Sequence, residues 1–233
     1  AGDGPPPSVS SVAYWDEFYS HRQAQWDTLY GYVDIRPVLS RWLHKPRGGA
    51  SHRAGLRLLH VGCGTSNVTE GLWRDGLRSI CNIDFSKEVI RLMAKRWEEL
   101  AERTADRGAE DDAAAMRSGV QWRHMDMTDL SALDSGSFDL VLEKFTFDAL
   151  LCDAKDDASD GRGCAAIREL HRVLAPGGTL VSIAWGEKRR PALLRSGGLF
   201  DLECLRLPGD ATQRPLVYAC LKRPTAGKTA KAE

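Results

Sequence analysis

The sequence predicts an α/β fold: a doubly wound, mostly parallel sheet of seven strands with an antiparallel strand pair at its edge. Short apolar runs, each long enough for one strand, alternate with helix-like segments along the chain, as expected for parallel strands joined by helices. The last two runs, residues 200–207 and 216–221, alternate between apolar and polar side chains and predict the antiparallel pair. A length of 233 residues suits one substantial domain of this class, expected over residues 13–222.

Two helices are expected before the first strand. Residues 1–12 are rich in Gly, Pro and Ser and are predicted to be disordered. The next segment is densely aromatic, and Trp15 and Tyr19 are four residues apart, which places both on one face of a helix. A second helix is expected over residues 33–43. It should end there because a proline and a pair of glycines follow.

The first strand and its loop are the centre of the prediction. Residues 56–61 form an almost continuous apolar run, as expected of a central parallel strand covered on both faces. Gly62 and Gly64 then remove two side chains where the backbone must turn tightly and let a ligand approach. A helix over residues 66–73 should follow, capped by Thr65, Ser66 or Asn67.

The remaining elements follow from the same patterns. A second strand ends at Asp84, and Ser86 can cap a long helix whose apolar residues recur at nearly 3.6-residue intervals. Residues 103–118 are charged and Ala-rich without apolar periodicity, which predicts a surface extension. The second strand is expected over residues 79–83. Further strands are expected at residues 120–125, 138–142 and 179–184, a helix at 165–174, and a flexible tail at 223–233.

Composition limits the function. Lys plus Arg and Asp plus Glu both number 32, so the formal net charge is zero and there is no electrostatic case for generic nucleic-acid or membrane binding. No apolar run is long enough to span a membrane. Six scattered cysteines without a C-x-x-C pair predict thiols in a reducing compartment and no metal site. We expect a cytoplasmic protein; a mitochondrial one stays open because the first residue is Ala, so the start looks trimmed.

The glycine loop and a distant acid predict a nucleoside site. Asp84 lies 20 positions after Gly64, the separation at which a carboxylate meets a pair of ribose hydroxyls. Asn67 stands where a dinucleotide fingerprint has its third glycine, so a nucleoside without phosphate fits better, and S-adenosylmethionine is the obvious one. Four strand ends should meet at this edge of the sheet, at residues 62–66, 84–86, 126–127 and 143–144.

Two motifs carry a resemblance to a known family. Residues 61–66 with Asp84 resemble the glycine loop and ribose acid of class I S-adenosylmethionine-dependent methyltransferases, whose fold is Rossmann-like. Residues 143–151 are similar to the Asp/Glu-Lys-Gly-Thr-x-Asp-Ala signature of protein-lysine methyltransferases that act on translation elongation factor 1A and on citrate synthase. The resemblance runs in consistent order over residues 14–185.

The resemblance implies roles for individual residues. Trp15, Tyr19 and Trp26 would surround the methionine end of the cofactor, where ring faces attract a sulfonium; packing onto the core is the alternative interpretation. Asp84 would hold the ribose, while Phe85, Asp126 and Met127 would contact the adenine, although Met127 also suits ordinary core packing. The loop residues that complete the cofactor set are Gly62, Cys63, Gly64, Thr65 and Ser66.

The expected catalytic residues follow the same signature. Lys144 would contact the cofactor or order the catalytic loop, and Glu143 or Asp148 would orient the incoming amine. Phe145 stands where the signature has Gly, so a ring fills space that is open in the family and reshapes the acceptor pocket. His60 also departs from the acid that often precedes the glycine loop in the wider class.

The leading hypothesis is therefore a protein-lysine N-methyltransferase with a protein substrate, elongation factor 1A being the first candidate. A small-molecule methyltransferase on the same fold and a catalytically silent cofactor-binding partner subunit stay open as alternatives. A dehydrogenase ranks below them because of Asn67.

Overall fold

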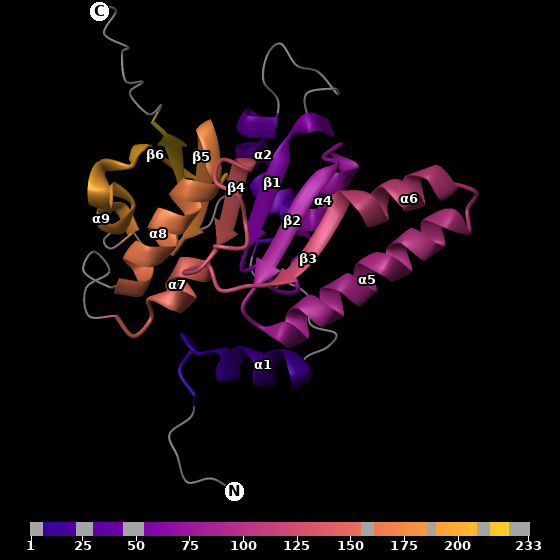
Figure 1. Ribbon diagram of the computed structural model, residues 1–233, viewed down its shortest axis with the longest axis horizontal. Coiled ribbons are helices and arrows are strands. Elements are labelled where there is room, and N and C mark those ends of the chain that lie inside the picture. Colours follow the sequence, from indigo (N-terminus) through magenta and orange to yellow (C-terminus); the bar gives the residue numbers. More distant parts are fainter. Residues whose placement is uncertain are drawn as a thin grey trace, which may run out of the picture.

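A seven-stranded sheet forms the centre of the computed structural model, which describes residues 7–21, 30–43, 54–154, 161–185, 190–208 and 215–223. The strand order is β3-β2-β1-β4-β5-β7-β6 (Figure 1), so the predicted fold class is confirmed. The strands are β1 (Arg57–Val61), β2 (Ser79–Asp84), β3 (Val120–His124), β4 (Phe138–Lys144), β5 (Leu174–Ala184), β6 (Phe200–Arg206) and β7 (Leu216–Lys222).

The strand order reverses beside β1. From β1 the chain adds β2 and β3 on one side, then returns to place β4 and β5 on the other, all parallel. Leu58 is therefore paired with Ile80 of β2 and with Leu140 of β4. Strand β7 runs antiparallel to β5, and β6 runs antiparallel to β7, which is the predicted edge pair. In sheets of this kind ligands bind beyond the carboxyl ends of the strands where the order reverses, here between β1 and β4.

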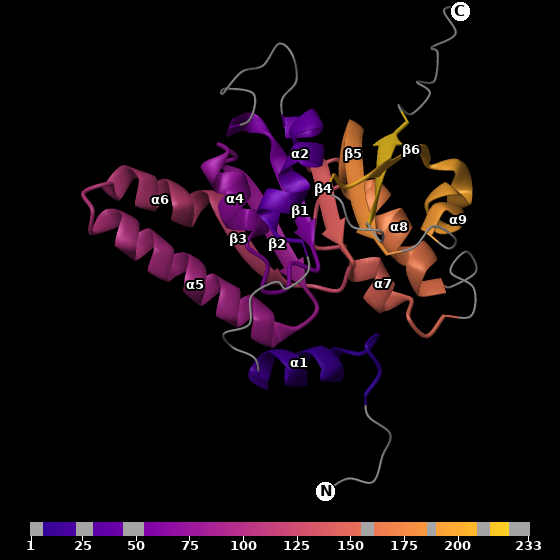
Figure 2. The ribbon, with the colours of Figure 1, turned by 180° about the vertical axis from the view of Figure 1, so that it is seen from behind.

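Helices cover both faces of the sheet because successive strand side chains point to opposite sides. Leu59 and Val141 face α8, while Leu58 and Leu140 face α2 and α4. Helix α8 lies in front of the sheet in Figure 1, and α2 and α4 lie in front in Figure 2. The helices are α1 (Val12–His21), α2 (Tyr32–Leu43), α4 (Val68–Arg74), α5 (Lys87–Ala105), α6 (Glu110–Gly119), α7 (Thr146–Leu150), α8 (Gly161–Val173), α9 (Arg190–Arg195) and the 3-10 turn η1 (Ser196–Gly198).

Helix α5 follows its sequence signals closely. The Ser86 hydroxyl accepts a hydrogen bond from Val89 N at 3.4 Å, as expected of an N-cap. Val89, Met93 and Trp97 recur every four residues and are all buried, so one face of the helix packs onto the core.

Residues 103–118 lie mostly at the surface, as predicted, but most of them are helical, which was not predicted. Helix α5 continues to Ala105 and, after a short turn, α6 packs against both α5 and β3. Ala113 and Met116 are buried, and the Trp97 indole N–H donates to the Met116 carbonyl at 3.0 Å. Two buried side chains in ten residues give too weak a period to indicate a helix.

The amino-terminal segment also differs from its prediction. Residues 7–11 fall within the stretch expected to be disordered, yet Ser8 and Ser10 both donate hydrogen bonds to the Asp153 carboxylate after α7, the bond from Ser10 being 2.7 Å long. Arg162 donates to the Ser10 carbonyl at 3.2 Å. The segment leads into α1, which lies across the ends of the strands in Figures 1 and 2. Residues 1–6 and the tail from residue 224 onward lie outside the described residues.

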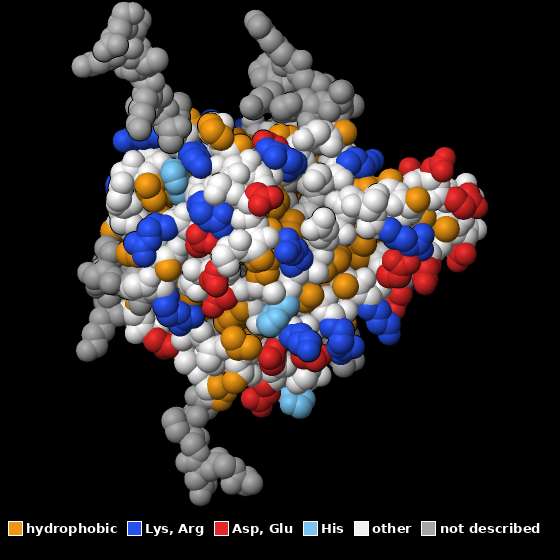
Figure 3. Space-filling view, in the orientation of Figure 1, with side chains coloured by type: hydrophobic (Ala, Val, Ile, Leu, Met, Phe, Trp, Pro, Cys, Tyr) orange, Lys and Arg blue, Asp and Glu red, His pale blue; other side chains and the backbone are white. Residues whose placement is uncertain are grey.

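Charges of both signs are interspersed over the described residues on the face seen in Figure 3. Acidic side chains gather toward the tip of the α5–α6 pair, where α6 begins with Glu110, Asp111 and Asp112. Among the helices that the structure describes, none combines the length and the apolar character needed to cross a membrane.

Candidate active site

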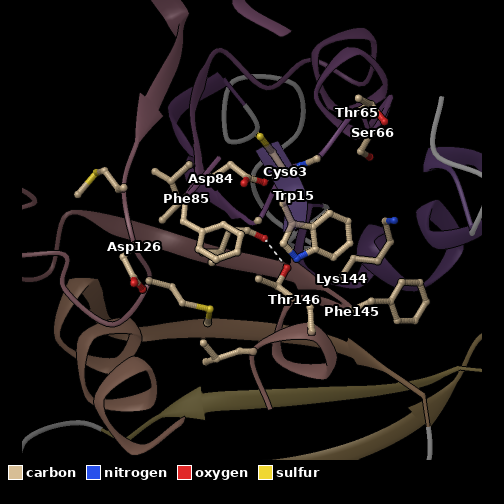
Figure 4. Close-up of a pocket in the computed structure, with 18 of the residues that line it drawn as sticks. Trp15, Cys63, Thr65, Ser66, Asp84, Phe85, Asp126, Lys144, Phe145 and Thr146 are labelled. Atoms are coloured by element: carbon tan, nitrogen blue, oxygen red, sulfur yellow. Dashed lines mark hydrogen bonds between the residues drawn. The ribbon is translucent and has the colours of Figure 1, made fainter. Parts of the chain in front are cut away.

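A cavity opens at the carboxyl ends of β1, β2 and β4, beside α1 (Figure 4). Its lining includes three of the four predicted strand ends: the glycine loop at 62–66, Asp84 with Phe85, and Asp126 with Met127. From the fourth, Lys144 lines the cavity and Glu143 does not. The parallel topology therefore brings together residues that are up to 82 positions apart, from Gly62 to Lys144.

The two loop glycines are required by backbone shape and by space. Gly62 and Gly64 have φ angles of 59° and 51°, in the left-handed region that other residues avoid. A Cβ on Gly62 would lie 2.3 Å from the Thr146 hydroxyl, and one on Gly64 would lie 3.1 Å from the Tyr19 hydroxyl. Thr146, which was not singled out from the sequence, donates to the Val61 carbonyl at 3.1 Å and so ties α7 to the loop.

Helix α4 begins just beyond this loop, at Val68. Ser66 acts as predicted, because its hydroxyl accepts from Val68 N at 3.2 Å. The Asn67 side chain makes no cap on α4 and accepts from Tyr32 N at 2.8 Å instead. Asn67 thus joins α2 to the loop, a contact that no local pattern in the sequence indicates.

Asp84 is buried at the end of β2, with 5% of its surface exposed. Its carboxylate accepts hydrogen bonds from Gly64 N at 3.0 Å and Ser86 N at 2.9 Å. Burial nonetheless raises the pKa of Asp84 to about 6, opposed by these two bonds and assisted by the nearby charge of Asp16. Asp16 itself accepts from the Ser86 hydroxyl at 2.5 Å, which holds α1 beside this carboxylate.

The end of β3 supplies a polar and an apolar group. The Asp126 side chain is exposed, and one of its oxygens accepts from Thr128 N and from the Thr128 hydroxyl, both at 2.8 Å. Met127 is buried in the core cluster beneath α8 and also lines the cavity, so core packing is observed and contact with the adenine stays a prediction. Phe85 lies between Asp84 and Asp126 in Figure 4.

The aromatic face of α1 closes this part of the cavity. Trp15 and Tyr19 line it with their rings stacked at 5.6 Å, and Phe18, which was missed, lines it as well. The same rings pack against Val89 and Met93 of α5, so they serve both the core and the cavity. Trp26 lies outside the described residues.

Behind the loop, His60 belongs to a buried polar network. Its Nδ1 lies 3.2 Å from the Asn82 amide oxygen, which also accepts from the Thr69 hydroxyl at 2.6 Å. Burial, and then the charge of Lys144, lower the pKa of His60 to about 4. His60 is therefore a neutral structural residue at physiological pH, where the wider class often has an acid.

The structure corrects the positions predicted for Glu143 and Asp148. Glu143 is fully buried, paired with Arg190 at 2.6 Å, and bonded to the Ser182 hydroxyl and to the backbone of Thr146 and Phe147. Asp148 accepts from Arg190 at 2.7 Å and from Trp185 N at 3.0 Å. Neither residue lines the cavity: their carboxylates hold Arg190, the start of α7 and the backbone of Trp185 around it. Arg190 was missed because it is 47 residues from Glu143 in sequence.

Phe145 adopts the conformation that a glycine would adopt freely. Its φ is 62°, a left-handed value that costs a bulky residue on the order of 1–3 kcal/mol. Its backbone N–H donates to the Ile183 carbonyl at 2.8 Å, and its ring stacks on Trp185 at 5.4 Å. The Lys144 amine lies 5.2 Å from the centre of the same ring. A glycine, as in the similar signature, adopts this backbone conformation without strain. This chain has phenylalanine at the same position.

The residues present fit an uncharged nucleoside joined to a cationic group. A buried carboxylate beside a glycine loop suits a ribose diol, an apolar ring and a thioether suit a base, and the α1 rings suit a cation. In the described residues no three or more His, Cys, Asp or Glu side chains form a group that could hold a metal ion.

Comparisons with known proteins agree with this geometry. A model of the methyltransferase domain family matches residues 59–182. The eEF1A lysine and N-terminal methyltransferase of Bos taurus is 33% identical over 194 residues, a match covering 83% of this chain and 24% of the relative. The EEF1A lysine methyltransferase 4 of Mus musculus is 30% identical over 194 residues, covering 77% of this chain and 67% of the relative.

A solved structure shows the same fold. The N-methyltransferase NodS from Bradyrhizobium japonicum, in complex with S-adenosyl-L-homocysteine, superposes with a TM-score of 0.60 at 18% identity. The match covers 91% of this chain and 99% of NodS. The chain spans about a quarter of the length of the first curated relative.

Proposed function

Because the chain belongs to the S-adenosylmethionine-dependent methyltransferases, we propose that it transfers a methyl group to the side-chain amine of a lysine in a protein, with eEF1A as the first candidate. The observation that carries the lysine assignment is the segment from Glu143 to Leu151. This segment is similar to a signature of protein-lysine methyltransferases, and it forms the end of β4 and α7 at the cavity. The names of the two relatives support the same choice of substrate.

The cofactor would lie along the strand ends. We assign Asp84 to the two ribose hydroxyls, Phe85 and Met127 to the faces of the adenine, and Asp126 to its amino group. Trp15 and Tyr19 would turn ring faces toward the positive sulfur, an arrangement that the ring quadrupole favours. Bound S-adenosylmethionine supplies an electrophilic methyl group on that sulfur.

The acceptor amine must arrive neutral, and its ordinary pKa of about 10.4 works against that. Apolar surroundings such as Phe18 disfavour the charged form, and so does the like charge of Lys144. The chain would then hold the nitrogen in line with the methyl group. This orientation lowers the activation barrier, and the reaction of a neutral amine requires no dedicated base. The lysine ammonium therefore releases its proton to solvent before the attack. As the new N–C bond forms, the S–C bond of the cofactor breaks, S-adenosyl-L-homocysteine is left with a neutral sulfur, and the methylated nitrogen carries the positive charge.

The proposal is tested with labelled S-adenosylmethionine and recombinant eEF1A, followed by mass spectrometry of the product. Label on a lysine of eEF1A supports it. An Asp84→Ala variant should lose cofactor binding in calorimetry and give no label. Label found only in small molecules of a cell extract, or cofactor binding without any transfer, would overturn the lysine assignment in favour of a small-molecule enzyme or a silent subunit.

A further inference from the structure

Two bulky residues near the mouth of the cavity have unfavourable backbone conformations. Among the described residues, the non-glycine positions with a left-handed φ are Tyr30, at 54°, and Phe145, at 62°. Their ring centroids lie 6.3 Å apart, and the ring planes are tilted by 59°. L-residues with large side chains avoid this region, and they persist in it only where the surrounding structure holds them there. Residues in such conformations cluster at active sites and ligand-binding loops, and here both of them meet in one contact.

A third ring completes this feature. Trp185, directly after β5, lies 5.8 Å from Tyr30 and stacks on Phe145 with an angle of 13° between the planes. The backbone of Trp185 is fixed by Asp148, which is held in turn by the buried Arg190. We call Tyr30, Phe145 and Trp185 the aromatic wall.

The aromatic wall extends from the cavity to solvent. Phe145 lines the cavity, while Trp185 is 40% exposed. In Figure 4 Phe145 and Lys144 lie on one side of the cavity, and Asp84, Phe85 and Asp126 lie on the other. With the nucleoside placed at Asp84, the opposite side of the cavity, where Phe145 lies, is left for an acceptor.

Resting on the proposed function, we propose that the aromatic wall binds the aliphatic stem of the acceptor lysine and that Phe145 determines acceptor specificity. A lysine side chain has a long apolar stem that lies well along ring faces and a terminal nitrogen that must reach the cavity. The Lys144 amine lies 5.2 Å from the centre of the Phe145 ring, so this ring already has one lysine side chain beside it. A glycine at this position, as in the similar signature, offers no such surface.

The test restores the glycine. Phe145→Gly removes one ring of the wall but accepts a φ of 62° without strain, so the fold should keep its thermal midpoint. With recombinant eEF1A as the acceptor, KM should rise about tenfold with kcat nearly unchanged, the size expected for losing one ring contact. Calorimetry with S-adenosyl-L-homocysteine bound should show the same loss in eEF1A affinity, independently of turnover.

Matched variants locate the effect. Trp185→Ala should weaken eEF1A binding, whereas Trp42→Ala, which removes another partly buried indole on α2, should leave it unchanged. An active wild-type chain whose acceptor KM and affinity are unaffected by both Phe145→Gly and Trp185→Ala would overturn the inference while leaving the proposed function intact. A wild-type chain that labels no protein lysine overturns the proposed function, and the aromatic wall then loses its assigned occupant.

Discussion

Asp84 is under two opposing influences. Its buried position favours the protonated acid and raises its pKa to about 6, yet only the ionised carboxylate can accept from both hydroxyls of a ribose. We therefore predict that cofactor affinity is full above pH 7 and falls as the pH drops through 6. At pH 5 about one carboxylate in ten is ionised. The dissociation constant measured by calorimetry should therefore be about tenfold larger at pH 5 than above pH 7.

Two controls accompany this prediction. An Asp84→Asn variant should bind the cofactor weakly, with no change between pH 5 and 7.5. The unliganded fold should behave in the opposite sense, because an acid with a raised folded pKa binds its proton more tightly in the folded chain. Relative to Asp84→Asn, the unliganded wild type should gain stability as the pH falls from about 7 to 4. An affinity that is flat with pH would show that Asp84 does not hold the ribose as its ionised form.

Lys144 should matter for turnover more than for folding. Its side chain is partly exposed, lines the cavity and lies over the Phe145 ring, so its loss costs the core little. We expect Lys144→Ala to lower kcat at least tenfold while shifting the urea midpoint only slightly. Steady-state kinetics and urea unfolding of the same preparation test this. Equal losses of stability and activity would assign Lys144 a structural role.

For single residues, the sequence predicted the position of a side chain correctly where that position depends on neighbours in the chain or on the end of a strand. Asp84 and the glycines were predicted because spacing after a strand fixes where a side chain goes. Glu143 was misplaced because the side chains that occupy its carboxylate, Ser182 and Arg190, come from distant parts of the chain. Strand-end position alone does not reveal whether a carboxylate faces a cavity or a buried cation.

At the level of secondary-structure elements, one ion pair holds β4, α7 and α9 together. Arg190 and Glu143 have side-chain exposures of 3% and 0%, and Arg190 also holds Asp148. Removing the cation leaves a buried carboxylate without its partner, which costs about 3–5 kcal/mol in such pairs. We predict that Arg190→Met lowers the free energy of unfolding by this order, measured by urea denaturation.

An exposed pair gives the matched control. Arg223 lies 2.8 Å from Asp201, but both side chains are more than half exposed, so Arg223→Met should change stability by less than about 1 kcal/mol. The double variant Glu143→Gln with Arg190→Met should recover part of the loss, because the unpaired buried charge is gone. A small effect of Arg190→Met alone would mean that Glu143 is already neutral in the fold; burial raises the pKa of Glu143, and the charge of Arg190 opposes that shift.

Element prediction failed where the signal was short. Strands and the long helix α5 were found because apolar residues recur over many positions. Helices α7 and α9, of five and six residues, were not anticipated, and α6 buries only Ala113 and Met116. Their formation depends on packing against α8, α5 and the sheet, which a local pattern does not contain.

Over the whole molecule, the amino-terminal segment joins the two halves of the sheet. Asp16 of α1 bonds to Ser86 on the β2 side, and Ser8 and Ser10 bond to Asp153 on the β4 side. These hydrogen bonds span the point where strand order reverses, and between them Trp15 and Tyr19 line the cavity. The segment therefore covers the cavity. We expect cofactor affinity to depend on the hydrogen bonds that attach the segment as well as on its aromatic rings.

We predict that Asp153→Ala weakens cofactor binding several-fold while leaving the unfolding midpoint of the unliganded protein nearly unchanged. Asp153 is exposed, and the bonds from Ser8 and Ser10 hold its pKa below the usual value, so its loss frees the segment without opening the core. The thermal midpoint at a fixed cofactor concentration reports the change, because ligand stabilisation follows the ratio of concentration to dissociation constant. Asp201→Ala, which removes an exposed aspartate on β6, should keep the full ligand-induced shift. If Asp153→Ala also keeps it, the α1 rings bind the cofactor without help from this attachment; if its unliganded midpoint falls as well, the segment is part of the core.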